Sequence, residues 1–269
     1  GVNLKDAIPY GSKDCVLPVV PMFHVNAWGT PYAALMCGSK IVFPGSKLDG
    51  ESLTELMNAE KVTISLGVPT VWLLLLNYLR SSGKKLETVQ RLIIGGSACP
   101  RTLFEGFGEE YNVDVIHAWG MTEMSPIGTA NNPLFNMNPK DKKEYYDQKI
   151  PQGRTVFGHE MKLLDDDGNE VEQDGTSQGR LLSRGYWVLK SYYNDDTQKD
   201  RFFEGGWFDT GDIATIDQNG FMTITDRNKD IIKSGGEWIS SIDLENICVG
   251  HPDVANAAAI AVPDEKWDE

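Results

Sequence analysis

The chain has 269 residues, 41% of them apolar, and its 25 Lys and Arg against 39 Asp and Glu give a formal net charge of −14. This length supports one large globular core or two smaller ones. No basic stripe and no apolar run of transmembrane length is visible, so we expect no nucleic-acid partner, no transmembrane segment and a cytoplasmic location. An acidic chain can still bind a polyphosphate through local lysines, backbone N–H groups and a divalent cation.

The cysteines and histidines indicate neither a disulfide framework nor a zinc site. The 4 cysteines have no CxxC spacing, which is typical of reduced thiols in a cytosolic compartment. The 4 histidines form no HxxxH or HxxH pair. The chain has no initiator Met, and it stops just after an apolar segment. We therefore expect a piece of a longer enzyme.

Up to about residue 130, short apolar strands alternate with amphipathic helices. Strands are predicted at residues 15–22, 40–43, 62–66, 91–94 and 113–118, and helices at residues 51–60 and 70–79 and after Pro100. This alternation predicts βαβ units and a mostly parallel, buried sheet. Ligands of such sheets bind at the carboxyl ends of strands, where Gly95-Gly96 and Trp119-Gly120 fall.

The second half of the chain has a different pattern. Residues 131–150 are polar and predict a surface excursion. Short strands follow at residues 161–164, 170–171, 179–188, 207–216 and 221–225, with hairpin turns at 165–169 and 217–220, and predict a β-rich, barrel-like subdomain. After Arg227, residues 240–243 cap a short helix and residues 257–262 open a new strand. We expect a large domain over residues 1–228 (an α/β portion at 1–150 and a β-rich portion at 151–228) and a small domain over 229–269.

The pentad Trp119-Gly120-Met121-Thr122-Glu123 has the chemistry to cover most of a nucleotide. An indole can stack on a base, a glycine lets backbone approach a ligand closely, and a hydroxyl–carboxylate pair suits phosphate oxygens and a hard cation. Taken alone, the pentad is more typical of a strand-to-turn junction with Thr122 as a local cap, and it is the surrounding sequence that favours the nucleotide site.

Further clusters each have a functional and a purely structural interpretation. Residues 207–212 offer a carboxylate after a glycine turn, suited to ribose hydroxyls, or a plain strand–turn–strand. Residues 226–238 combine charges with a glycine pair, as in a solvated loop or a domain hinge that binds phosphate or ribose. His24 lies among aromatic residues, where a buried hydrogen-bonded histidine is commoner than a catalytic one.

Residues 21–29, 95–98, 119–123, 206–214 and 226–245 resemble, in order and context, the acyl-adenylate-forming superfamily, and are most similar to its medium- and long-chain fatty acyl-CoA synthetases. The resemblance implies an α/β fold with a large adenylate-forming N-terminal domain followed by the start of a small α+β C-terminal domain. It also implies a ligase that joins a carboxylic acid to ATP, releases pyrophosphate, and transfers the acyl group from AMP to coenzyme A. Small-molecule substrates and Mg²⁺ are the partners and cofactor implied, and homodimers occur among relatives.

The resemblance assigns a nucleotide-binding role to several residues. Trp119 would stack on adenine, at a position where relatives usually carry Tyr. Thr122 would hold phosphate and Glu123 would hold Mg²⁺, beside Gly120 and Met121. Asp212 and Arg227 would hold ribose. The wall between adenine and the acyl pocket would consist of Gly95, Gly96 and Ser97.

The resemblance also assigns residues to the acyl and coenzyme A sites. His24 matches the family histidine near the reacting carboxylate, where a donor stabilises developing negative charge. Trp28 matches the tryptophan that gates the fatty-acid tunnel, although it could equally be static core. Lys229 falls on the family hinge, and the pantetheine passage would be lined by Gly235, Gly236 and Trp238.

Two alternatives stay open. The acid could be a short chain such as a methylthio-propionate, or an aryl acid, within the same superfamily. A non-catalytic nucleotide-binding relative is the second alternative, although Thr122, Glu123, Asp212 and Arg227 are all present. The family's phosphate loop and C-terminal catalytic lysine have no counterpart in these residues. We therefore expect the 269 residues alone to turn over poorly or not at all.

Overall fold

The computed structural model describes residues 8–134, 137, 139–234, 237–249, 254 and 257–264. The chain divides into two compact units. Unit 1 comprises Gly1–His159 and Tyr186–Val188, and unit 2 comprises Glu160–Gly185 and Leu189–Glu269. The domain boundary that the sequence predicts after residue 228 stays a prediction.

Unit 1 is built on a seven-stranded sheet in the order β2-β1-β3-β4-β5-β6-β7. The first five strands in this order are parallel: β2 (Lys40–Ile41), β1 (Cys15–Pro18), β3 (Ile64–Gly67), β4 (Arg91–Ile94) and β5 (Asp114–Gly120). The predicted parallel, βαβ-type sheet is therefore confirmed. The antiparallel strands β6 (Ile127–Ala130) and β7 (Arg154–Thr155) were not predicted. The connection from β5 to β6 is too short for a crossover, so it makes a hairpin.

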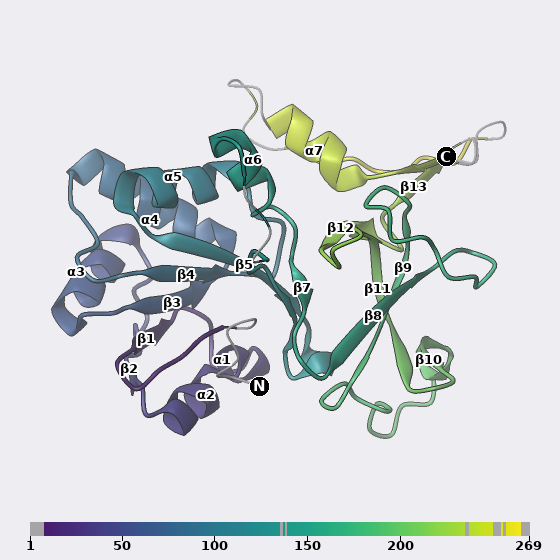
Figure 1. The fold of residues 1–269 in the computed structure, drawn as a ribbon, viewed down its shortest axis with the longest axis horizontal. Coiled ribbons are helices and arrows are strands. Elements are labelled where there is room, and N and C mark those ends of the chain that lie inside the picture. Colours follow the sequence, from purple (N-terminus) through teal and green to yellow (C-terminus); the bar gives the residue numbers. More distant parts are fainter. Residues whose placement is uncertain are drawn as a thin grey trace. The chain divides into compact units, whose positions relative to one another are not determined.

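Helices cover both faces of this sheet (Figure 1). On one face, α3 (Gly50–Glu60), α4 (Pro69–Ser82) and α5 (Arg101–Tyr111) bury Trp72, Phe104 and Phe107 against alternate strand residues. On the other face, α2 (Thr30–Cys37) packs Ala33 and Ala34 against the remaining strand residues, such as Ile93. Because both faces are covered, the strands are continuous apolar runs.

Most of the described residues in 131–150 are exposed or half-buried, as the predicted polar surface excursion requires, but the segment also has buried members. It contains α6 (Lys142–Asp147), whose Tyr146 joins the core, and the buried Asn131 and Lys149. The Asn131 amide donates to the carbonyl oxygens of Gln148 (2.9 Å) and Pro151 (2.7 Å). Polar side chains here satisfy buried backbone groups, so polarity did not indicate exposure at Asn131 and Lys149.

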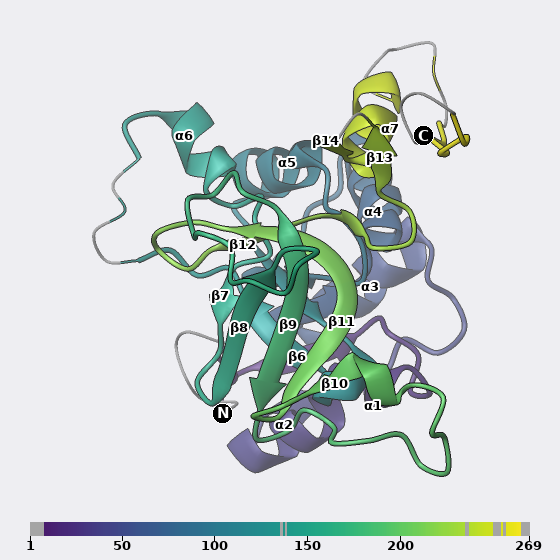
Figure 2. The same ribbon diagram turned by 90° about the vertical axis from the view of Figure 1, so that its right-hand side faces the viewer.

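Unit 2 contains a curled antiparallel sheet in the order β10-β11-β9-β8, with β12 also paired to β11. Its strands are β8 (His159–Leu164), β9 (Gly179–Gly185), β10 (Phe202–Phe203), β11 (Trp207–Ile216) and β12 (Met222–Arg227). Figure 2 shows the bend of β11 beside β9. The predicted β-rich subdomain and its hairpin turn are confirmed, since Leu164 and Glu170 bridge across the turn. The pairings among described residues leave the sheet open.

The last elements of unit 2 are the hairpin β13 (Ile232–Ser234) and β14 (Glu237–Ile239), and the helix α7 (Ser241–Val249). The predicted short helix is confirmed. The N–H of its first residue, Ser241, donates a hydrogen bond to the Asp226 carboxylate at 2.6 Å, so a residue distant in the chain also caps the helix. The predicted strand at residues 257–262 is wrong, since these residues pair with no strand in the part that the structure describes. No described helix is both long and apolar enough to cross a bilayer.

Candidate active site

Predicted site residues of unit 1 follow the carboxyl ends of β1, β4 and β5, and several of them are in contact. A Cβ on Gly95 would lie 2.9 Å from the carbonyl oxygen of Ala118 and 3.4 Å from Cη2 of Trp28. Gly96 has a φ of +86°, and a Cβ there would lie 3.8 Å from Cζ2 of Trp28. The Trp28 indole therefore lies against the Gly95–Gly96 turn, while the close approach that requires glycine at position 95 is that of the Ala118 backbone.

The segment that carries His24 and Trp28 is strained. Within α1 (Val25–Trp28) the φ values are 39°, 49°, 51° and 55°, and Gly29 continues at 71°. This is a left-handed turn, which costs L-residues about 1–2 kcal/mol each. The Asn26 amide bonds the Tyr32 hydroxyl at 3.0 Å, and the Gly29 N–H bonds the Val25 carbonyl oxygen at 3.2 Å. Such strain concentrates at functional sites, and here it sets where Trp28 points while His24, just before the turn, stays exposed.

The pentad at the end of β5 folds back tightly. A Cβ on Gly120 would lie 2.0 Å from the Pro126 carbonyl oxygen, and one on Gly128 would lie 2.6 Å from Cζ3 of Trp119. The Trp119 indole is only 8% exposed because it packs over Gly128 and Met124. The sequence predicts that Gly120 lets the backbone approach a ligand closely. In the structure, Gly120 also lets the backbone of Pro126 approach closely. The predicted strand-to-turn junction is present as well.

Thr122 and Glu123 lie in the 3₁₀ turn η1 (Thr122–Met124) directly after β5. Thr122 is exposed and Glu123 is half-buried. No group of three or more His, Cys, Asp or Glu that could hold a metal occurs among the described residues. Mg²⁺ typically takes one or two carboxylates together with substrate phosphates. The hydroxyl–carboxylate pair therefore fits Mg²⁺ held jointly with a polyphosphate, and does not form an all-protein cage.

In unit 2, the structure brings Asp212 and Arg227 together. They are opposite each other on β11 and β12, and Arg227 Nε lies 3.0 Å from Asp212 Oδ1. The Asp212 side chain is 5% exposed and that of Arg227 is 59% exposed. Asp212 lies in an irregular stretch of β11 between Asp209 and Ile213, where Gly211 has a φ of +78°. Arg227 is the last residue of β12 and its exposed guanidinium marks where the buried Asp212 carboxylate lies; a carboxylate of this kind can accept hydrogen bonds from hydroxyl groups.

The predicted hinge and coenzyme A residues have fewer described contacts than the residues above. Lys229 is exposed in the turn after β12. Trp238 lies on β14 opposite Lys233, whose ammonium is 4.5 Å from the indole centroid. Gly235 and Gly236 lie outside the described residues.

An apolar cavity of about 330 Å³ adjoins Trp28 in unit 1, and the sequence did not predict it. Its walls come from segments far apart along the chain, so no local pattern could indicate it. Aromatic and aliphatic side chains dominate the lining, which consists of Ile8, Tyr10, Trp28, Gly29, Tyr32, Ala33, Met36, Ser125, Pro126, Ile127, Val156 and Trp187. Such a cavity suits an apolar ligand.

His117 on β5 is a further residue that sequence reasoning missed. It is 1% exposed, and Nδ1 donates to the Ile150 carbonyl oxygen at 2.7 Å. Burial lowers the pKa of His117 below its usual 6.5. A neutral imidazole therefore ties β5, near the pentad, to the segment after α6.

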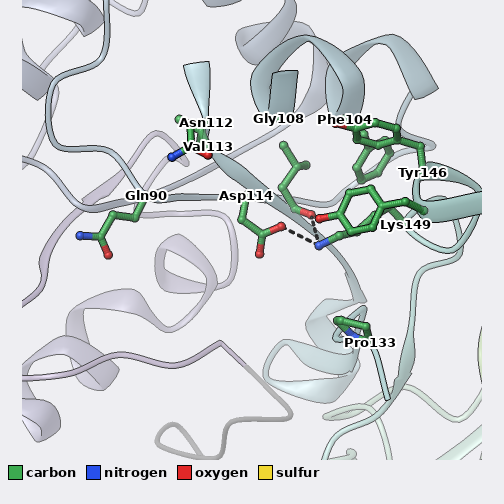
Figure 3. A pocket seen from close by; sticks show the side chains of 11 residues that line it. Gln90, Phe104, Gly108, Asn112, Val113, Asp114, Pro133, Tyr146 and Lys149 are labelled. Carbon is green, nitrogen blue, oxygen red and sulfur yellow. Dashed lines mark hydrogen bonds and ion pairs between the residues drawn. The ribbon is translucent and has the colours of Figure 1, made fainter. Parts of the chain in front are cut away.

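A second cavity of unit 1, of about 420 Å³, lies at the amino end of β5 and contains none of the predicted site residues. Figure 3 shows the Lys149 ammonium directed at Asp114 in its wall. The Nζ–Oδ1 distance is 2.6 Å, and Lys149 also bonds the Val115 carbonyl oxygen at 3.5 Å. Because this buried ammonium already has its counter-ion, we assign it a structural role.

Comparison with known proteins shows which family the chain resembles. Residues 2–193 match the model of the AMP-binding enzyme family. The chain is 53% identical over 267 residues to the 3-methylmercaptopropionyl-CoA ligase of Ruegeria lacuscaerulensis, covering 99% of this chain and 49% of that protein. It is 51% identical to the medium-chain-fatty-acid–CoA ligase of Ectopseudomonas oleovorans, with 99% and 48% covered. The chain thus spans about half the length of the curated relatives it matches.

A solved structure has the same fold. O-succinylbenzoate coenzyme A synthetase from Bacillus subtilis, in complex with ATP and magnesium ion, superimposes with a TM-score of 0.82 at 26% identity, over 97% of this chain and 51% of that one. The α/β adenylate-forming fold that the sequence predicted is therefore confirmed. The family match covers most of the chain, and the chain belongs to the AMP-binding enzyme family.

Proposed function

We propose that the full-length protein is an ATP-dependent, AMP-forming acid–CoA ligase that acts on an acid with an apolar chain. In the first step a carboxylate oxygen bonds the α-phosphorus of ATP, and the bond to pyrophosphate breaks. In the second step the thiol sulfur of coenzyme A bonds the acyl carbon, AMP leaves, and the thiol proton is lost. The observation that carries this proposal is the position of Trp28, which contacts the Gly95–Gly96 turn and also lines the apolar cavity.

This position matches what the first step needs. The reacting carboxylate must meet the α-phosphate while its chain stays out of water. A nucleotide along Gly95, Gly96 and Ser97 would lie next to the Trp28 indole, whose ring also lines the cavity. We infer that Trp28 borders the acyl chain, and that the exposed His24, just before the left-handed turn, donates a hydrogen bond to the carboxylate.

The end of β5 supplies the phosphate-binding groups in this proposal. Trp119 and Met121 contact the nucleotide, the Thr122 hydroxyl bonds a phosphate oxygen, and the Glu123 carboxylate holds Mg²⁺ with the phosphates. When bound, Mg²⁺ supplies Lewis-acid stabilisation of the charge on the phosphate oxygens. The Gly120 and Gly128 contacts support this role, because they hold the turn in one conformation.

In unit 2 the proposed roles rest on the ion pair and on the resemblance of residues 206–214 and 226–245. The Asp212 carboxylate, fixed by Arg227, accepts from ribose hydroxyls. Lys229 serves as the hinge at which the small C-terminal domain rotates between adenylation and acyl transfer. Trp238 lines the passage for the pantetheine arm of coenzyme A. A cytoplasmic location and a homodimer stay predictions.

Two classes of acid fit the apolar lining of the cavity. A fatty acid is favoured by the apolar lining of the cavity and by the names of two relatives, the medium-chain enzyme and the long-chain-fatty-acid–CoA ligase of Thermus thermophilus, which is 45% identical to this chain. A methylmercaptopropionate-type acid is the second candidate, because a relative of that name is 53% identical. A thioether chain is also apolar and fits the same lining.

Product analysis tests the reaction class. The full-length protein is incubated with ATP, Mg²⁺, coenzyme A and one acid at a time, from 3-methylmercaptopropionate to palmitate. We expect AMP and the acyl-CoA in equal amounts. Formation of ADP, or AMP without any acyl-CoA, would contradict the proposed function. The same assay without ATP is the control.

A further inference from the structure

The segment Tyr186–Val188 belongs to unit 1, although the residues on both sides of it belong to unit 2. It directly follows β9, which ends at Gly185. The strand that the sequence predicts at residues 179–188 is therefore three residues longer than the observed one. This three-residue segment brings one large side chain, that of Trp187, into the wall of the apolar cavity. Neither the composition nor the periodicity of the sequence indicated this.

Trp187 is fixed by contacts on several sides. Its Nε1–H donates to the Ile127 carbonyl oxygen at 2.9 Å, and its own carbonyl oxygen accepts from the Ser125 hydroxyl at 3.3 Å. Its ring stacks on His159, with centroids 6.4 Å apart and planes at 19°. The indole also packs on the small core of Ala130 and Val156. A side chain held by so many contacts cannot easily move aside for a ligand.

The indole presents only hydrocarbon to the cavity. Its one polar group already bonds Ile127, so a ligand that touches Trp187 gains nothing from a charged or hydrogen-bonding end. Other lining residues are adaptable by comparison, since Tyr32 is 59% exposed and Met36 is 78% exposed. Trp187 is thus a rigid part of a wall in which the exposed Tyr32 and Met36 can shift.

We propose that Trp187 is a specificity-determining residue that limits the length of the acyl chain bound in this cavity. The inference rests on the proposed function, since it takes the cavity to be the acyl site. The expected ligand is an unbranched alkyl or thioether chain that ends against the indole. Ser125, which bonds the Trp187 backbone, is two residues from Glu123, so the wall is fixed relative to the phosphate-binding turn.

The test compares variants of the full-length protein across saturated acids of increasing length. Trp187→Leu removes ring volume, and we expect the ratio of kcat/KM for long over medium chains to rise by at least about tenfold, the effect of one or two methylenes in an apolar pocket. Trp187→Phe keeps an aromatic wall and should move the ratio in the same direction by less. Tyr186→Leu is the matched control, because Tyr186 is 89% exposed and is not part of the lining. The ratio of kcat/KM for long over medium chains in Tyr186→Leu should equal that of the unmodified protein.

Each outcome decides the inference. A folded Trp187→Leu variant that is active with an unchanged length profile overturns it, as does an equal shift in Tyr186→Leu. If Trp187→Leu fails to fold, Trp187→Phe carries the test, and an unchanged profile there also overturns it. If the unmodified protein forms no acyl-CoA with any acid, the proposed function fails first, and the inference fails with it.

Discussion

Trp28 and Gly95 contact each other at the carboxyl edge of the unit 1 sheet. Cη2 of Trp28 would be 3.4 Å from a Cβ on Gly95, and the carbonyl oxygen of Ala118 would be 2.9 Å from it. The left-handed turn at Val25–Trp28 brings the indole to this position. Gly95, directly after β4, therefore has the Ala118 backbone of β5 and the indole of a residue that follows β1 as its neighbours.

Gly95→Ala should damage both stability and adenylation. The added methyl group would meet backbone at 2.9 Å, which cannot rotate away, so overpacking should cost about 1–3 kcal/mol of unfolding free energy. The shift away from Ala118 would also move the turn that Trp28 contacts, so the KM for the acid should rise. Chemical denaturation and initial rates measure the two effects. Gly11→Ala is the control, since a Cβ there would meet nothing closer than 3.5 Å; equal losses in the two variants would contradict the account.

Glu123→Gln should depress adenylation while leaving the fold intact. The change keeps the shape of the side chain but removes the anionic charge offered to Mg²⁺, and a loss on the order of 10²-fold in rate is expected. The half-saturating Mg²⁺ concentration should rise as well. Rates measured over a range of Mg²⁺, with circular dichroism as the folding control, test this. Rates equal to those of the unmodified protein at every Mg²⁺ concentration would refute the role of Glu123.

Lys229→Pro should impair acyl transfer to coenzyme A more than adenylation. Proline fixes φ near about −65° and would restrict the exposed turn after β12. The two steps are measured separately, as pyrophosphate release without coenzyme A and as acyl-CoA formation from isolated acyl-AMP. Lys229→Ala is the control that removes the charge and leaves φ free. Equal loss in both steps would count against a hinge at this position.

The contributions of Lys149 and Asp114 to the free energy of unfolding should depend on each other, while neither residue should affect catalysis. Their side chains are 7% and 45% exposed and lie 2.6 Å apart. Because Asp114 is partly solvated, each single change, Lys149→Met or Asp114→Asn, should cost only about 1–2 kcal/mol. The double variant should lose less than the sum of the two. Denaturation curves measure the cycle. Strict additivity, or a changed KM for ATP, would oppose this assignment.

His117 should make the protein less stable in weak acid. Burial lowers its pKa in the folded state from the usual 6.5, so below pH 6.5 the unfolded chain binds a proton that the folded chain does not. Stability should therefore fall as the pH drops below this value, by at most about 1.4 kcal/mol per pH unit from this residue. His117→Asn keeps a donor for the Ile150 carbonyl oxygen and should show a shallower decline. An unchanged pH profile of the unfolding free energy would contradict this origin.

Much of the fold could be predicted from the sequence. The strands at Arg91–Ile94 and Trp207–Ile216 coincide with β4 and β11. Apolar runs between amphipathic helices indicate a buried parallel sheet wherever both faces are covered, and this holds from β1 to β5. The contact of Trp28 with Gly95 and the ion pair of Asp212 with Arg227 join residues that the resemblance had already singled out.

Other features depend on contacts that no local pattern contains. Within the polar segment 131–150, Asn131 and Lys149 are buried and bond other protein groups, which only the three-dimensional contacts show. The left-handed turn at Val25–Trp28 opposes the propensity of L-residues, so the local sequence could not indicate it. The cavity wall at Trp187 comes from a segment whose neighbours in the chain belong to the other unit.

Acid-dependent exchange of pyrophosphate into ATP by the full-length protein, measured without coenzyme A over acids from propionate to palmitate, tests the central claim most directly. Adenylation is reversible, so exchange requires the first step and no other. We predict Mg²⁺-dependent exchange that rises with the length of the apolar chain and is lost in Glu123→Gln. Exchange confined to short or aryl acids would keep the mechanism and change the substrate. Absence of exchange with every acid, in a folded protein with Mg²⁺ present, would contradict the account.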